Sequence, residues 1–111
     1  MSLFQLVMSP WGKKIRLEDL AQQIAQSHWV KVWERLSDQV WQMSRHERKG
    51  YIRARGALLI QQAAEQAIRQ RRLGQNSLAK LYALAMDRVV GHVSEHMANC
   101  LPRAKTLRRA A

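Results

Sequence analysis

The chain has 111 residues and a formal net charge of +11 at neutral pH, from 19 Lys and Arg and 8 Asp and Glu. The single cysteine excludes a disulfide within this sequence, and the length suits one domain that buries a modest core without a metal. With two prolines, five glycines and abundant Ala, Leu, Gln and Arg, the composition argues against a sheet and predicts an all-α fold.

The positive charge is concentrated in two segments. Residues 44–73 carry eight basic and two acidic side chains, and residues 102–111 carry four basic and no acidic side chains. Residues 1–43 and 74–101 are close to neutral. This asymmetry indicates an anionic partner, which is nucleic acid, an anionic membrane surface or an acidic protein. The alternative is that these basic residues only keep the protein soluble and bind no partner.

We expect residues 1–14 to form an irregular lead-in, because Pro10 and Gly12 interrupt regular structure. The apolar run Leu3–Met8 is too short for a membrane span and lacks the basic start of a signal peptide. A cytoplasmic location, without integral membrane insertion, is therefore the expectation. The larger apolar side chains of the lead-in are expected to pack on the bundle or on a partner chain: Phe4, Leu6, Val7 and Trp11.

Between residues 15 and 43, apolar residues recur every three or four positions, which predicts helix. They follow two stripes, and the second stripe is rotated by about 100° from the first. Either the helix breaks near Ser27 or one helix packs on two neighbours, and a bend or break there is the preferred interpretation. Trp29 and Trp33 lie one turn apart on the second stripe, so we expect both in the core.

Several residues of this segment are expected on its surface. Trp41 and Val30 lie off the second stripe, which hints at a contact with a partner. The carboxylates of Glu34 and Asp38 are expected to pair with Lys31 and Arg35 of the same helix.

The sequence from Ser44 to Leu73 predicts one long helix. Ser44 followed by Glu47 is the signature of a capping box, and Gly74 is expected to end the helix in the left-handed conformation. Thirty residues of helix extend about 45 Å, whereas a domain of about 100 residues has a radius of gyration of about 13 Å. Either the molecule is elongated or a second copy covers the overhang, and this length favours a homodimer.

Two glycines lie inside the predicted long helix, and each costs about 1 kcal/mol relative to alanine. Gly56 falls on the apolar face and predicts the close approach of a neighbouring helix. Gly50 has no evident role in the sequence.

The last helix is expected to begin after a cap at Ser77 and to end at Leu101-Pro102. Because its connection to the long helix is short, the two should form an antiparallel hairpin over residues 44–101. The predicted architecture is an all-α bundle of three long or four shorter helices over residues 15–101. A basic, mobile tail follows at residues 102–111.

The start of the long helix and the tail form the candidate nucleic-acid site. Basic residues at a helix N-terminus are unfavourable, because they meet the positive end of the helix dipole. Several such residues at one N-terminus, without a visible compensating interaction, indicate a functional role. The free N–H groups there also favour an anion. Tyr51 is expected to stack on a base or to pack beneath arginine side chains. The candidate residues are Arg45, Arg48, Lys49, Tyr51, Arg53, Arg55, Arg103, Lys105, Arg108 and Arg109.

His92, His96 and Cys100 lie four residues apart on the last helix. An adjacent pair can chelate a transition metal, but all three cannot reach one ion, since the first and last are about 12 Å apart. Core packing is the favoured interpretation, and we predict neither a metal nor another cofactor. No Gly-rich phosphate loop or nucleophile elbow points to catalysis, so the chain is not expected to be an enzyme.

The predicted function is therefore the binding of nucleic acid, DNA or RNA, either nonspecifically or as a regulator. A helical adaptor or regulatory subunit that binds an acidic protein is the alternative. A third possibility is attachment to an anionic membrane surface.

Overall fold

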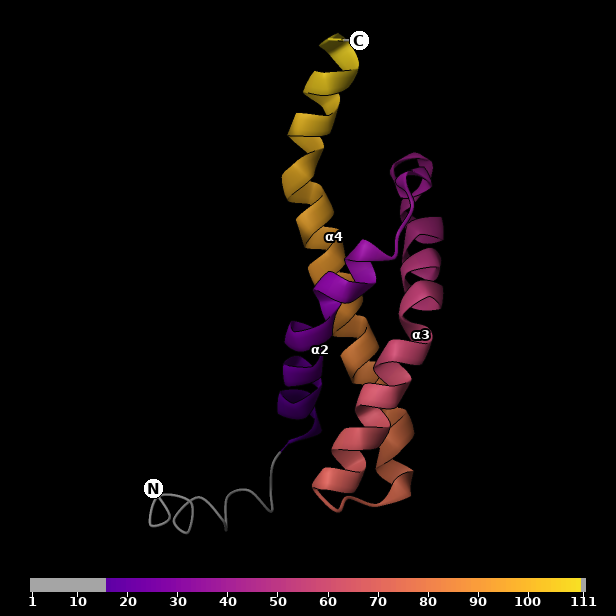
Figure 1. The fold of residues 1–111 in the computed structure, drawn as a ribbon, viewed down its shortest axis with the longest axis vertical. Helices are drawn as coiled ribbons and strands as arrows, with labels where there is room; N and C mark the ends of the chain where they lie inside the picture. The colour runs from indigo at the N-terminus through magenta and orange to yellow at the C-terminus, as the bar shows by residue number, and fades with distance from the viewer. Residues whose placement is uncertain (1–15, 111) are drawn as a thin grey trace, which may run out of the picture.

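The computed structural model describes the backbone of residues 16–110 and the side chains of residues 16–100. This part of the chain contains helices and no strands, which confirms the all-α prediction. The elements are α2 (Leu17–Glu34), η1 (Asp38–Gln42), α3 (Arg45–Gln70), η2 (Gln75–Ser77) and α4 (Leu78–Ala110), where η denotes a short 3-10 helix. The three α helices pack together, and α3 and α4 run in opposite directions (Figure 1). The packing expected of Phe4, Leu6, Val7 and Trp11 concerns residues outside the described part.

Helix α2 is continuous, so the predicted break near Ser27 is wrong. The two apolar stripes arise because α2 packs on both α3 and α4, and most extensively on α4. The chain leaves the helix at Arg35 instead, where its N–H donates to the carbonyl of Val32 at 3.0 Å. The Leu36 N–H donates to the carbonyl of Trp33 at 3.1 Å. These short-range bonds tighten the last turn of α2 and lead into η1.

The N-terminus of α3 has the predicted capping box. The side-chain oxygen of Ser44 accepts from the Glu47 N–H at 3.2 Å, and the Ser44 N–H donates to Glu47 Oε1 at 3.3 Å. The Ser44 hydroxyl and then the Ser44 backbone N–H favour the charged carboxylate, and they lower the pKa of Glu47 below its ordinary value. The predicted start of the long helix is therefore confirmed.

The C-terminus of α3 corrects the prediction for Gly74. Gly74 has a φ of −70°, whereas Arg72 adopts the left-handed conformation with a φ of 54°. The Leu73 N–H donates to the Ile68 carbonyl at 2.9 Å and the Arg72 N–H donates to the Arg69 carbonyl at 3.3 Å, which is the Schellman pattern. The reversal thus begins two residues earlier than expected, at a non-glycine residue.

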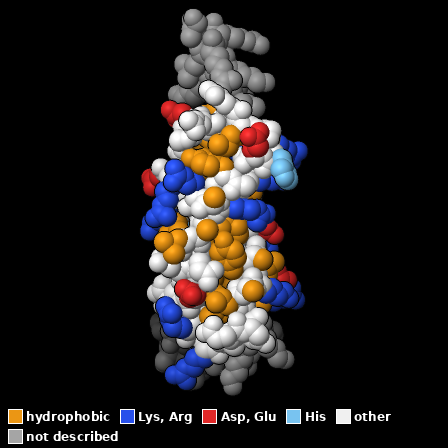
Figure 2. Space-filling model, turned by 90° about the vertical axis from the view of Figure 1, so that its right-hand side faces the viewer, with side chains coloured by type: hydrophobic (Ala, Val, Ile, Leu, Met, Phe, Trp, Pro, Cys, Tyr) orange, Lys and Arg blue, Asp and Glu red, His pale blue; other side chains and the backbone are white. Residues whose placement is uncertain are grey.

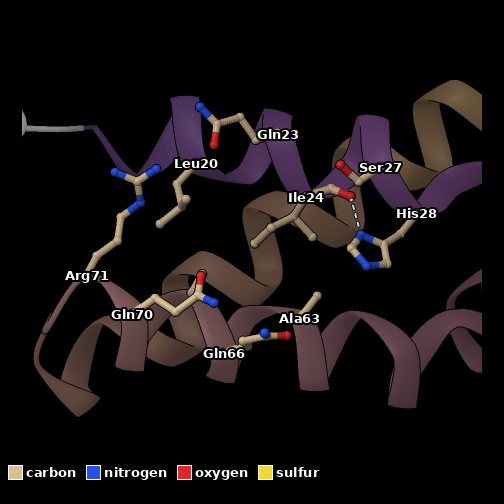
Figure 3. Close-up of a pocket in the computed structure, with 10 residues that line it drawn as sticks. Leu20, Gln23, Ile24, Ser27, His28, Ala63, Gln66, Gln70 and Arg71 are labelled. Carbon is tan, nitrogen blue, oxygen red and sulfur yellow. Dashed lines mark hydrogen bonds between the residues drawn. The ribbon is translucent and has the colours of Figure 1, made fainter. Parts of the chain in front are cut away.

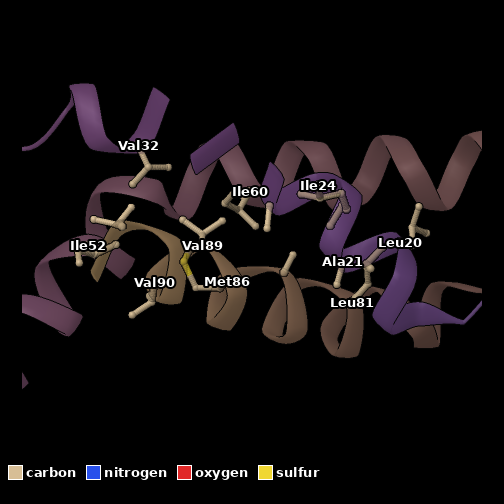
Figure 4. Packing of buried hydrophobic residues seen from close by; sticks show 14 of the residues in the cluster. Leu20, Ala21, Ile24, Val32, Ile52, Ile60, Leu81, Met86, Val89 and Val90 are labelled. Atoms are coloured by element: carbon tan, nitrogen blue, oxygen red, sulfur yellow. The ribbon is translucent and has the colours of Figure 1, made fainter. Parts of the chain in front are cut away.

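The three helices bury one apolar core (Figure 4). Gly56 of α3 lies in close contact with both other helices, because a Cβ added there would lie 3.1 Å from Cγ2 of Val32 on α2 and 3.7 Å from Cε of Met86 on α4. The predicted close approach at Gly56 is confirmed. The buried hydrophobic residues are Leu20, Ala21, Ile24, Ala25, Val32, Val40, Ile52, Ile60, Ala64, Ala67, Ile68, Leu81, Ala85, Met86, Val89, Val90, Val93 and Met97.

Helix α4 continues through Pro102 to Ala110, so the predicted end at Leu101-Pro102 is wrong. Proline lacks an N–H and removes one backbone hydrogen bond from a helix. The residues after Pro102 are mostly Ala, Lys, Arg and Leu, which are strong helix formers and favour continuation. The basic residues of segment 102–110 therefore lie on a helix.

The molecule is elongated, with principal extents of 60 × 29 × 17 Å and a radius of gyration of 17.4 Å. A compact domain of similar length would have a radius of about 13 Å. Elongation was one of the two outcomes expected from the length of α3, and it accounts for the overhang without a second copy. In the described part of the chain, no helix is long and apolar enough to cross a membrane.

Alanine substitutions at two glycines of α3 should have opposite effects on stability. No atom lies within 4 Å of a Cβ placed at Gly50, so Gly50→Ala should raise the free energy of unfolding by about 1 kcal/mol. Gly56→Ala forces Val32 away, at an overpacking cost of about 1–3 kcal/mol that exceeds the gain in helix propensity. Urea unfolding followed by circular dichroism measures both. Equal stabilisation by both substitutions would show that α2 does not press on Gly56.

Arg72→Gly should stabilise the protein by about 1 kcal/mol, because the left-handed conformation costs a side-chain-bearing residue about 1–2 kcal/mol. Arg71→Gly removes the same charge at a residue with a φ of −99°, where glycine relieves no strain, so it should lower stability. Thermal unfolding of the two variants makes the comparison. A gain for both variants would point to charge rather than backbone strain.

Candidate nucleic-acid interface

The opposite directions of α3 and α4 bring two basic segments to one end of the molecule. The first turns of α3 and the last turns of α4 both lie at the upper end in Figure 1. We call this set of residues the basic end. It comprises Arg45, Lys49, Arg53 and Arg55 on α3, and Arg103, Lys105, Arg108 and Arg109 on α4, whose side chains lie outside the described part.

Arg45 and Lys49 are exposed on the first two turns of α3. They follow the capping box directly, where backbone N–H groups and the helix dipole already favour an anion. The capping carboxylate of Glu47 is engaged with Ser44. Both basic side chains are therefore accessible to a negatively charged partner.

Arg48 has a structural role that its sequence position did not reveal. Its Nη2 donates to the backbone carbonyl of Met43 at 3.2 Å, and the residue is half-buried. Its Nε is buried and has no hydrogen-bond partner within the described part. Arg48 thus joins α3 to the end of the preceding loop through its guanidinium.

Tyr51 forms a small network with Ser37 and Arg55. Its hydroxyl donates to the Ser37 hydroxyl at 3.2 Å and accepts from the Ser37 N–H at 3.0 Å and from Nε of Arg55 at 3.4 Å. The Arg55 guanidinium carbon lies 5.6 Å from the centre of the Tyr51 ring, within cation–π range. Of the two roles expected for Tyr51, packing beneath an arginine is the one observed.

The network also changes the acidity of Tyr51. Hydrogen bonds from Ser37 and then from Arg55 favour the phenolate, and together they lower the pKa of Tyr51 to about 8. Ser37 is a contributor that sequence reasoning missed. It precedes η1 by one residue, and only the turn after α2 brings it to α3.

Arg53 is partly neutralised by α4. Its Nη2 lies 2.8 Å from Oδ1 of Asp87, and this is the single ion pair among residues 16–100. The two side chains are 48% and 64% exposed, so the pair is solvated and contributes at most about 1 kcal/mol. Asp87 was not expected near the site, because the pairing depends on the register between α3 and α4.

His92, His96 and Cys100 lie against the tryptophans of α2. The His92 ring stacks on Trp29 with centroids 6.1 Å apart, and the His96 ring meets Trp33 edge-on at 4.7 Å. The Cys100 sulfur lies 3.8 Å from Nε2 of His96. Within residues 16–100, no three His, Cys, Asp or Glu side chains are placed to hold a metal ion together. The three residues are half-buried rather than part of the core, and the two histidines contribute aromatic packing between α2 and α4.

Trp41 is partly buried and packs against the core. Its ring meets Trp33 edge-on at a centroid distance of 6.2 Å, and the residue is half-buried. The exposed large hydrophobics of the described part are Val30 and Leu58, at 45% and 66%. Leu58 belongs to α3, and the α3 side of the molecule shows a column of hydrophobic side chains flanked by Lys and Arg (Figure 2).

A groove of about 260 Å³ runs between α2 and α3 at the end opposite the basic end (Figure 3). The polar residues that line it are Gln23, Ser27, His28, Gln66, Gln70 and Arg71. Nδ1 of His28 donates to the Ile24 carbonyl at 2.8 Å. The amide groups are neutral, and the only charged residue lining the groove is Arg71. It therefore offers little charge to an anionic polymer.

Comparison with protein-family models, with curated proteins and with solved structures finds no match to this chain. The function must therefore be inferred from the chemistry of the residues themselves.

Ser37→Ala should raise the pKa of Tyr51 from about 8 toward the ordinary tyrosine value, because it removes a hydroxyl that supports the phenolate. Ultraviolet absorbance of tyrosinate, measured as a function of pH, reports this change, and Tyr51→Phe identifies which transition belongs to Tyr51.

Since folding lowers this pKa, the unfolded state binds more protons between about pH 8 and pH 10, and stability contributed by Tyr51 should rise through that interval. Below the folded-state pKa the contribution is absent. An unchanged transition in the Ser37→Ala variant would show that the hydrogen bond does not persist in solution.

Proposed function

We propose that the protein binds nucleic acid nonspecifically through the basic end. The observation that carries the proposal is the opposite direction of α3 and α4, which places two basic segments separated by about 50 residues at one end of the molecule. A cluster of Lys and Arg residues in one region of the surface is typical of proteins that bind a phosphate backbone. The start of α3 and the end of α4 together present more positive charges than either segment presents alone.

Accessible cations on α3 support the proposal. Arg45, Lys49 and Arg55 are exposed, and no ion pair engages them within the described part. Arg55 is held over the ring of Tyr51, which limits its freedom before it meets a phosphate. Arg48 is excluded from the interface, since its guanidinium bonds to Met43.

The end of α4 supplies the second half of the interface. Its last turns extend past the rest of the described chain (Figure 1). This projecting helix carries four basic residues and no acidic residue after Pro102. A helix about 10–12 Å across fits the major groove of a DNA duplex, so an extended basic helix suits double-stranded DNA. The proposal requires one copy of the chain.

A salt series tests the proposal, with fluorescence anisotropy measured on a labelled DNA duplex and on a single-stranded RNA. The logarithm of affinity should fall linearly with the logarithm of salt concentration. Replacing Arg45, Lys49 and Arg55 with glutamine should reduce the slope by about three, which is about one per lost phosphate contact. Circular dichroism of each variant establishes that its fold is intact.

The matched control variant replaces Arg69, Arg71 and Arg72 with glutamine at the opposite end of α3. It removes the same charge, and it should change the slope by less than one. Equal losses for both triple variants would show that net charge, and not the basic end, determines binding. Absence of binding at low salt would overturn the proposal, and tighter binding of polyglutamate than of the duplex would favour an acidic protein as the partner.

A further inference from the structure

A second hollow, of about 240 Å³, lies between the end of α2 and η1. We call it the aromatic pocket. It is lined by Trp33, Glu34, Leu36, Ser37, Asp38, Val40 and Trp41. None of the candidate nucleic-acid ligands lines it, so its chemistry is separate from that of the basic end.

Two tryptophans form walls of the aromatic pocket. The rings of Trp33 and Trp41 lie 6.2 Å apart at an interplanar angle of 84°, and both residues are half-buried. The other neighbour of Trp33 is the ring of His96, which meets it at 79°. Tryptophan has the strongest cation–π attraction of the aromatic side chains, and aromatic cages of this kind hold quaternary ammonium groups.

Two carboxylates border the same pocket. Glu34 is the last residue of α2 and Asp38 is the first residue of η1, and the turn between them brings both to one side. The pairing predicted for them with a lysine and an arginine of the same helix is wrong, because the one ion pair among residues 16–100 joins Arg53 and Asp87. In a chain with a net charge of +11, these two carboxylates have no ion-pair partner among residues 16–100.

The pocket is held in shape by contacts outside it. Tyr51 of α3 bonds to both the N–H and the hydroxyl of Ser37, which fixes the turn between the two carboxylates. Val40 is 1% exposed and anchors η1 in the core, and its N–H donates to the Ser37 carbonyl at 3.1 Å. A ligand would therefore meet walls that are already in place, which lowers the entropic cost of binding.

We infer that the aromatic pocket binds an alkylated ammonium ion. Tryptophan walls attract the cation, its methyl groups replace water against Trp33, Leu36 and Trp41, and Glu34 and Asp38 supply the counter-charge. The volume equals roughly eight water molecules, enough for a trimethylammonium group and part of its chain. The ammonium comes either from a small molecule such as choline or from a methylated lysine of another protein.

Titration of the full chain with choline chloride, against sodium chloride at equal ionic strength, tests the inference through tryptophan fluorescence. Choline should give a saturable change that sodium chloride does not give. Neohexanol, the uncharged isostere of choline, should bind at least about 5-fold more weakly, since it keeps the methyl groups and lacks the cation. Equal binding of the two would overturn the inference, and so would the absence of any saturable change.

The carboxylates are tested by Glu34→Gln combined with Asp38→Asn, which should weaken choline binding by about 5- to 10-fold. The matched control is Glu18→Gln combined with Asp19→Asn at the other end of α2, which should leave the affinity unchanged. Equal weakening by both double variants would contradict a local role for Glu34 and Asp38. Both variants retain all four tryptophans and the packing beneath them.

A peptide that carries trimethyllysine, titrated beside its unmethylated form, distinguishes the two sources of the ligand. Tighter binding of the methylated peptide than of choline would assign a protein partner, whereas tighter binding of choline would assign a small molecule. Under both assignments, the methylated peptide should bind more tightly than the unmethylated peptide, because the methyl groups contribute to binding. A preference for the unmethylated lysine would contradict the inference, because the methyl groups would then contribute nothing.

Discussion

The contact of α2 with α3 at Gly56 is the constraint on which the remaining packing depends. Val32 comes so close to this glycine that a Cβ added there would displace the Val32 side chain by a few tenths of an ångström. Met86 of α4 meets the same point, so all three helices converge there. Because α2 packs closely against both α3 and α4, Trp29 and Trp33 contact the histidines of α4. The same position brings Ser37, in the turn after α2, within hydrogen-bond distance of Tyr51. The aromatic pocket and the network around Tyr51 both follow from the position of α2.

Features that depend on neighbouring residues could be predicted from the sequence, whereas features that depend on tertiary contact could not. The capping box at Ser44 involves residues three apart, and the role of Gly56 follows from its place on an apolar face. The two apolar stripes of α2 were ambiguous, since a break and a second neighbour give the same periodicity. The helix ends were missed because tertiary packing and nearby helix formers outweighed the local preferences of Gly74 and Pro102.

For the candidate site, the positions of the cations could be predicted from the sequence, whereas their partners within the fold could not. The sequence located the cations at the start of α3, but four of the six proposed ligands there have partners within the fold: Arg48, Tyr51, Arg53 and Arg55. These partners include Ser37 and Asp87, which come close only once the turn after α2 and the register of α3 against α4 are set. The charge count of a helix therefore overstates the charge available to a partner. Among these six residues, the ones whose side chains no hydrogen bond or ion pair engages in the described part are Arg45 and Lys49, on the first two turns of α3.

The preference of α2 for α4 has a consequence for the order in which the protein assembles during synthesis. Helix α2 packs most extensively on the helix that is farthest from it in the sequence. Its apolar face, which includes Leu20, Ile24 and Ala25, consequently has no complete binding surface until α4 has left the ribosome. Helices α3 and α4, joined by a short connection, can meet as soon as both are made. Of the three α helices described, the one synthesised first is thus the last to complete its burial, and during that interval its hydrophobic face is open to chaperones or to a second nascent chain.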